Sequence, residues 1–155
     1  MMSAAMPATT TIDTYQNPLL RSGLAFAGAN KLSSPSGEGD GIMTALEASG
    51  LDLEGTELVV LSACETGVGK VTNGDGVYGL RRALVIAGAQ TLVMSLWQVD
   101  DEATKDLMVG YYARLARGKS RSTALRDTQL ELSRGKFQHP YYWASFVPAG
   151  DDAPL

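Results

Sequence analysis

Two mainly apolar runs without a regular polar alternation, 58–61 and 91–96, most constrain the fold of this chain. Short runs of this kind, bounded by turn residues, are typical of strands buried on both faces of a parallel sheet. Between them, residues 77–87 carry apolar side chains at helical spacing, and Gly88 is placed to end that helix. The order strand, helix, strand predicts a parallel sheet with helices packed against it.

Weaker patterns extend this α/β arrangement in both directions. Residues 103–115 and 122–134 have the apolar spacing of amphipathic helices. We expect strands at 24–29 and 141–148, and a short helix at 42–49. The sequence therefore predicts helices and strands in alternation over most of its length.

Length and composition indicate one globular domain. The chain has 155 residues, of which 45% are apolar and 19% charged, which is ordinary for a folded domain. Residues 1–16 are small and polar and are expected to form a flexible lead-in. We place the domain at 17–151 and a short acidic tail at 152–155.

Charge and hydropathy exclude several classes of function. The net charge of −4 argues against nucleic-acid binding, which needs a basic face. No apolar stretch is long enough for a membrane helix, and residues 1–11 lack the pattern of a secretory signal, so the expected location is cytoplasmic. One basic cluster is expected to be a solvent-exposed surface, with the binding of an anion or an acidic partner as the alternative. It consists of Arg114, Arg117, Lys119, Arg121 and Arg126.

The only cysteine, Cys64, lies just beyond the first buried run and before a glycine-rich stretch. A lone cysteine is often a small buried hydrophobic residue. A thiol at the carboxyl end of a buried strand, however, is held rigidly beside a crevice where it can react. Backbone N–H groups of the loop residues Glu65, Thr66 and Gly67 are candidates to stabilise an oxyanion, which acyl transfer requires.

Partners for this thiol are few. The only histidine, His139, precedes Pro140 and an aromatic cluster, a context that favours a packed or surface histidine over a catalytic one. Asp100 and Asp101 follow the second buried run as Cys64 follows the first, so we expect them near the same crevice. There they can bind a basic substrate group, or cap the helix that follows.

Metal and nucleotide sites have little support. One cysteine and one histidine cannot build a structural zinc site, and we expect no metal and no cofactor. Gly74, Gly76 and Gly79 satisfy the dinucleotide-binding spacing, but that motif begins directly after its strand and here a long loop intervenes. A nucleotide-binding protein is therefore the weakest of the alternatives.

Four segments, taken in order, resemble the CHAT domain, a family of caspase-like and separase-like cysteine peptidase domains often joined to tetratricopeptide repeats. The segments are NPLLRSGLAFAGAN, LVVLSACETGVGK, GDGVYGLRRALVIAGAQTLVMSLWQVDDEAT and HPYYWASFVPAGD. The resemblance implies a caspase-like three-layer α/β/α sandwich with a mostly parallel sheet. It also implies that Cys64 is the nucleophile and that the segment containing Asp100 and Asp101 contributes to a pocket for a basic residue.

The chain departs from this family in one respect that bears on activity. The family's catalytic histidine lies upstream of the cysteine, about 50 residues away by caspase spacing, and no histidine precedes Cys64 here. We therefore expect the C-terminal part of a CHAT domain, with the N-terminal strands missing. Such a part is expected to self-associate or to need a complementary N-terminal CHAT piece or a tetratricopeptide-repeat protein as partner.

The sequence leaves two main functions open. The first is a cysteine endopeptidase lineage that prefers a basic residue before the scissile bond and is inactive alone because its histidine is absent. The second is a non-catalytic module that binds a peptide or a protein in the same crevice.

Overall fold

A three-stranded sheet organises the part of the chain that the computed structural model describes, residues 18–20, 22–27, 29, 41–62 and 75–155. Its order is β3 (Val59–Leu61), β4 (Thr91–Ser95), β5 (Phe146–Gly150). Strands β3 and β4 are parallel, which confirms the prediction from the two apolar runs, whereas β5 runs antiparallel to β4. The sheet in the described residues is therefore mixed, because the chain reaches β5 from the carboxyl end of β4.

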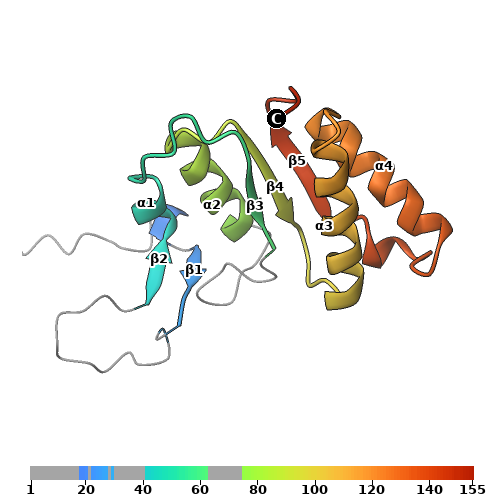
Figure 1. Cartoon of the computed structure of the whole chain (residues 1–155). Coiled ribbons are helices and arrows are strands. Elements are labelled where there is room, and N and C mark those ends of the chain that lie inside the picture. The colour runs from blue at the N-terminus through green and yellow to red at the C-terminus, as the bar shows by residue number, and fades with distance from the viewer. Residues whose placement is uncertain (1–17, 21, 28, 30–40, 63–74) are drawn as a thin grey trace, which may run out of the picture.

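Helices pack on both faces of this sheet (Figure 1). On one face lie α1 (Ala45–Ala48) and α2 (Asp75–Ile86), and on the other α3 (Asp101–Leu115) and α4 (Arg121–Arg134). The three predicted long helices are confirmed, each within two residues of the expected start. The result is a mixed α/β fold with a layered core.

The alternation of side chains along β4 divides the core into two halves. Leu92 and Met94 pack with α1 and α2, whereas Val93 packs with α3 and α4. All five residues of β4 are buried, since this strand lies in the middle of the sheet between two helical layers. Its three central residues, Leu92, Val93 and Met94, are accordingly all apolar.

The segment 42–49 differs from its prediction as a helix. Its first part is β2 (Ile42–Thr44), which pairs antiparallel with β1 (Gly23–Ala25) in a separate two-stranded sheet. The helix begins only after Thr44, whose side chain accepts from the Glu47 N–H while the Glu47 carboxylate accepts from the Thr44 N–H at 2.7 Å. This capping box fixes the start of the helix, so the β-branched Ile42 before it is available to pair with β1.

The segment 141–148 also differs in detail. It opens with a short 3₁₀ helix, η2 (Pro140–Tyr142), and β5 starts only at Phe146 and continues to Gly150. Proline at the first helical position favours the turn, because its fixed φ suits a helix and its missing N–H is not needed there.

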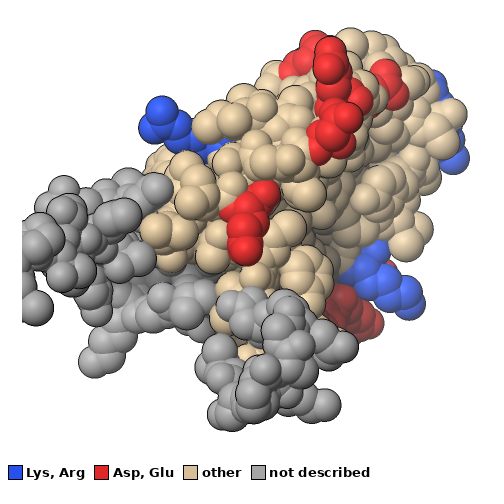
Figure 2. Space-filling view, turned by 90° about the vertical axis from the view of Figure 1, so that its left-hand side faces the viewer, with Lys and Arg blue, Asp and Glu red and all other residues tan. Residues whose placement is uncertain are grey.

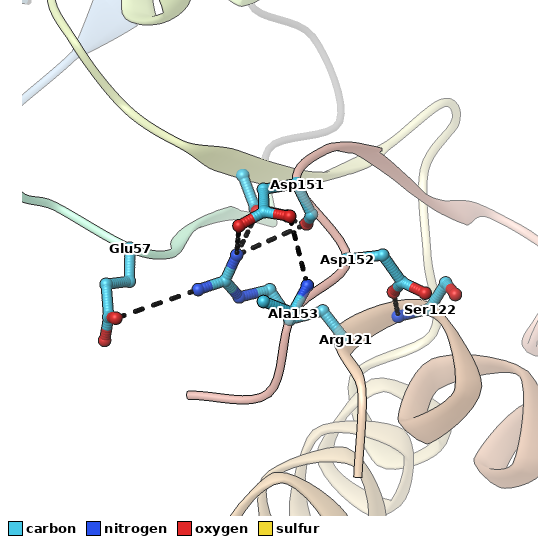
Figure 3. Close-up of polar contacts among 7 residues, drawn as sticks. Glu57, Arg121, Ser122, Asp151, Asp152 and Ala153 are labelled. Atoms are coloured by element: carbon cyan, nitrogen blue, oxygen red, sulfur yellow. Dashed lines mark hydrogen bonds and ion pairs between the residues drawn. The ribbon is translucent and has the colours of Figure 1, made fainter.

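Arg121 is buried, which contradicts the expectation of a solvated basic corner for this residue. Its side chain is 1% exposed, and the guanidinium donates to Thr91 Oγ1 at 2.9 Å and forms an ion pair with Asp151 at 3.4 Å (Figure 3). Glu57 lies 4.0 Å away on the other side. One arginine thus ties the start of α4 to the amino end of β4 and the far end of β5.

The tail beyond β5 extends the contacts of Arg121 with Thr91, Glu57 and Asp151, which we call the Arg121 cluster. Asp152 accepts a hydrogen bond from the backbone N–H of Ser122 at 2.6 Å, in the first turn of α4 (Figure 3). This hydrogen bond lowers the pKa of the Asp152 carboxyl from its usual range. A carboxylate at this position satisfies an N–H that the helix leaves unpaired and suits the positive end of the helix dipole.

Tyr111 lies in the core close to the same cluster. Its ring is fully buried, and burial, together with neighbouring Tyr112, raises the pKa of Tyr111 to about 12. The phenol therefore stays neutral at any physiological pH.

Within the described residues no helix has both the length and the apolar character needed to cross a bilayer.

Candidate functional site

The predicted nucleophile and oxyanion residues, Cys64, Glu65, Thr66 and Gly67, lie outside the described residues. Strand β3 ends at Leu61, and the exposed Ser62 is the last described residue before them. The assignment of Cys64 as a nucleophile therefore stays a prediction.

The strand pairings show which segments meet at the end of the sheet that Ser62 leaves. Leu61 pairs with Met94, so the carboxyl ends of β3 and β4 lie together. Phe146 pairs with Ser95, so the residues before β5 approach the same end from the other side. The carboxyl ends of β3 and β4 and the amino end of β5 thus meet at one end of the sheet. In α/β proteins, ligands usually bind beyond the carboxyl ends of the strands.

Asp100 is engaged in capping α3. Its Oδ1 accepts from the Ala103 N–H at 2.9 Å, the N-cap geometry expected from the sequence. Asp101 is exposed in the first turn of α3 and forms no ion pair with any residue the structure describes. Of the two acids predicted to bind a basic group, only Asp101 has an uncommitted carboxylate.

This difference predicts distinct effects of removing the two carboxylates. Asp100→Ala is expected to lower the free energy of unfolding by about 1 kcal/mol, because an N-cap acceptor is lost. Asp101→Ala, which removes only a dipole contact, is expected to cost less than half of that. Urea unfolding of both variants measures the difference, and equal losses would contradict the capping role of Asp100.

His139 is exposed and forms the cap of η2. Its Nδ1 accepts from the Tyr141 N–H at 3.2 Å, so the imidazole holds a local turn, as its sequence context indicates. The carbonyl of Tyr141 in turn accepts from Trp97 Nε1 at 3.1 Å, which joins this segment to the loop after β4. His139 precedes β5, the strand that lies on the other side of β4 from β3.

The glycine spacing that resembles a dinucleotide motif falls partly within α2. Gly76 and Gly79 are helical residues, and residues 62–74 separate the end of β3 from the helix. A dinucleotide fingerprint needs its first glycine directly after the strand so that the backbone approaches the pyrophosphate. Among the described residues no group of three or more His, Cys, Asp or Glu side chains is placed to hold a metal ion.

Sequence reasoning missed a hollow of about 260 Å³ between α2 and the β4–β5 pair. Its lining is mainly apolar, and the residues that form it are Tyr78, Arg81, Leu92, Met94, Leu96, Val147 and Ala149. The signal in the sequence was faint. The lining residues come from one helix, two strands and the residue after β4, which are far apart in the sequence. The one local pattern in the sequence that pointed to this hollow was the spacing of Val147 and Ala149 on either side of Pro148.

Known proteins place this chain in a family. Residues 7–151 match the family described as CHAT domain. The chain is 37% identical over 115 residues to Tetratricopeptide repeat protein 28 of Homo sapiens, and 36% identical over 115 residues to the protein of the same name in Mus musculus. The matched residues make up 74% of this chain but only 5% of each relative, so the chain spans a small part of their length. Because the family match extends over nearly its whole length, the chain belongs to the CHAT domain family.

Proposed function

We propose that this domain is built for cysteine-type peptide hydrolysis, with Cys64 as the nucleophile, and that residues 1–155 alone have little or no peptidase activity. The observation that carries the proposal is the parallel pairing of β3 with β4, because the carboxyl ends of these two strands, which Cys64 and Asp101 follow in the sequence, lie at the same end of the sheet. Membership of the CHAT family supports it. On the same grounds we propose that the helical layers around the sheet belong to a caspase-like sandwich.

The proposed reaction has two steps. A base takes the proton of the Cys64 thiol, the thiolate attacks the peptide carbonyl, and the C–N bond breaks as the proton passes to the leaving amine. Water then hydrolyses the thioester and regenerates the thiol. The N–H groups of Glu65, Thr66 and Gly67 would stabilise the oxyanion in both steps, and Asp101 would bind a basic residue before the scissile bond.

The missing component is the base. The sequence contains a single histidine, and the Nδ1 of His139 already accepts a backbone hydrogen bond in the turn before β5. An unassisted thiol is mostly protonated at neutral pH. We propose that the histidine comes from an N-terminal CHAT piece beside β3, which among the described strands pairs with β4 alone. A tetratricopeptide-repeat protein is the second proposed partner, because both relatives carry that name.

Titration of the thiol tests the absence of a base. Because Cys64 is the only cysteine, its alkylation by iodoacetamide reports on one group in the intact chain. We expect the rate to rise with pH around a pKa near the unperturbed value of about 8.5. His139→Ala should leave this profile unchanged. A midpoint below about pH 7 that is lost in His139→Ala would instead reveal a dyad between Cys64 and His139.

Substrate preference can be measured without the base. Peptidyl chloromethyl ketones alkylate a thiol directly, so the labelling rate of Cys64 depends on how well the peptide is positioned. A probe with lysine beside the reactive group is expected to label about tenfold faster than one with glutamate, and Asp101→Asn should abolish the difference. Equal rates with both probes would contradict a basic-residue pocket and favour a non-catalytic module that binds proteins.

A further inference from the structure

The α2 side of the sheet is left partly uncovered at strand β5. Leu92 pairs with Ala149 and Met94 pairs with Val147, so these four side chains form one patch on the sheet face. The helices α1 and α2 cover the β4 half of this patch, where Leu92 and Met94 are buried in the core. Val147 of the β5 half is 37% exposed and lines the open hollow beside α2.

The exposed apolar surface continues along α2. Tyr78 is 68% and Ile86 57% exposed, and Val85 and Leu96 are also exposed. A second hollow, over the outer surface of α2, shares Tyr78 and Arg81 with the first. We call the two together the α2–β5 groove. Large apolar side chains gathered around a hollow are typical of a surface that another molecule covers.

Two arginines give the groove a positive charge. Arg81 lines both hollows and Arg82 the second, and neither forms an ion pair or hydrogen bond with a residue the structure describes. On the face that forms the left-hand side of Figure 1, acidic side chains gather mainly over the middle and upper part, and basic side chains lie toward the margins (Figure 2). Carboxylates of a partner are therefore the complementary groups.

The outer edge of β5 is unsuited to pairing with another strand. The hydrogen bonds from Asp151 N to Gln90 O and from Leu96 N to Ser145 O place Phe146 and Pro148 at positions whose backbone points away from β4. Pro148 has no N–H to donate there, and the Phe146 carbonyl already accepts from Gln129 Nε2 at 2.9 Å. Both features block strand addition, so the occupant packs over the sheet face instead of extending it.

We propose that the α2–β5 groove docks an amphipathic helix from a partner protein. Its apolar stripe would lie on Val147, Ala149 and Leu96, beside α2 in the same layer as that helix. Aspartate or glutamate residues that flank the stripe would contact Arg81 and Arg82. This docking does not involve Cys64, and it holds whether or not the domain hydrolyses peptides.

A displayed library of 16-residue peptides provides the test. One set of members has a leucine stripe at helical spacing, and a second set has the same residues scrambled into the alternating pattern of an extended strand. In both sets the flanking positions vary between glutamate, glutamine and lysine. Selection is carried out on the full chain with Cys64→Ala, so that no thiol chemistry interferes. We expect enrichment of helical members with glutamate flanks.

Groove variants then decide where the enriched peptides bind. Arg81→Glu combined with Arg82→Glu should weaken binding at least tenfold and shift the preference to lysine flanks. Arg117→Glu, in the exposed turn after α3, should have little effect. Val147→Asp should also abolish binding. Circular dichroism and melting curves verify that each variant is folded.

Four outcomes would overturn the proposal. They are no enrichment of helical peptides, binding indifferent to the groove variants, enrichment of extended peptides, and a dimer of the chain that Val147→Asp dissociates. The extended peptides would indicate a substrate groove, and the dimer would show that a second copy covers this face.

Discussion

Replacement of Arg121 by methionine is expected to lower the free energy of unfolding by about 2–3 kcal/mol, the upper part of the range for hydrogen bonds to a charged group. Methionine keeps much of the buried volume, so the loss reports mainly on the hydrogen bond to Thr91 and the ion pair with Asp151. Losses above this range are not expected, because the partner carboxylates of Glu57 and Asp151 are each 55% exposed and return to water.

A matched control is available in the same helix. Arg126 is 73% exposed and lies 3.7 Å from Asp127, a surface pair, so Arg126→Met should change stability by no more than about 0.5 kcal/mol. Urea unfolding followed by circular dichroism measures both variants. Since Thr91 is at the amino end of β4, away from the candidate site, Arg121→Met should leave the alkylation rate of Cys64 unchanged in the folded protein. Equal stability of the two variants would contradict a structural role for the Arg121 cluster.

Gly88→Ala is expected to destabilise the fold by about 3 kcal/mol, the sum of backbone strain and a steric clash. Gly88 lies between α2 and β4 with φ of 108°, and a Cβ there would meet the backbone nitrogen of Glu54 at 2.8 Å. The backbone at Gly88 and the backbone at Glu54 cannot move apart independently. The Leu53 N–H donates to the Ala87 carbonyl at 2.8 Å and holds them together.

Gly55 separates the two contributions. Its φ of 82° is also left-handed, but a Cβ there would meet nothing within 4 Å. Gly55→Ala should therefore cost only the conformational strain, about 1 kcal/mol. Denaturant midpoints of the two variants give the comparison, and a loss in Gly88→Ala no larger than that in Gly55→Ala would show that the loop of Glu54 moves aside.

Local sequence patterns were sufficient for the elements near the candidate site. The buried runs predicted β3 and β4 and their parallel pairing, because a strand covered on both faces tends to be apolar without alternation. The apolar spacing predicted α2, α3 and α4. The N-cap of α3 at Asp100 was also predictable, since capping depends on residues only three apart.

The direction of β5 was not contained in any local pattern. An apolar strand reads the same in either orientation, and its direction depends on where the preceding chain crosses the sheet. The strand at β2 was missed for a related reason. Three residues form a strand only because β1, some twenty positions earlier, provides a partner, and the helix cap at Thr44 excludes them from α1.

The sequence by itself determined the family, the central parallel pair and the helices that flank it, because these follow from periodicity and from motifs of neighbouring residues. Only the tertiary structure decided the burial of Arg121 and the groove between α2 and β5. Arg121 is buried because Thr91 and Asp151, distant in sequence, satisfy its guanidinium. The groove exists because α2 covers β4 and leaves the β5 half of the same face exposed.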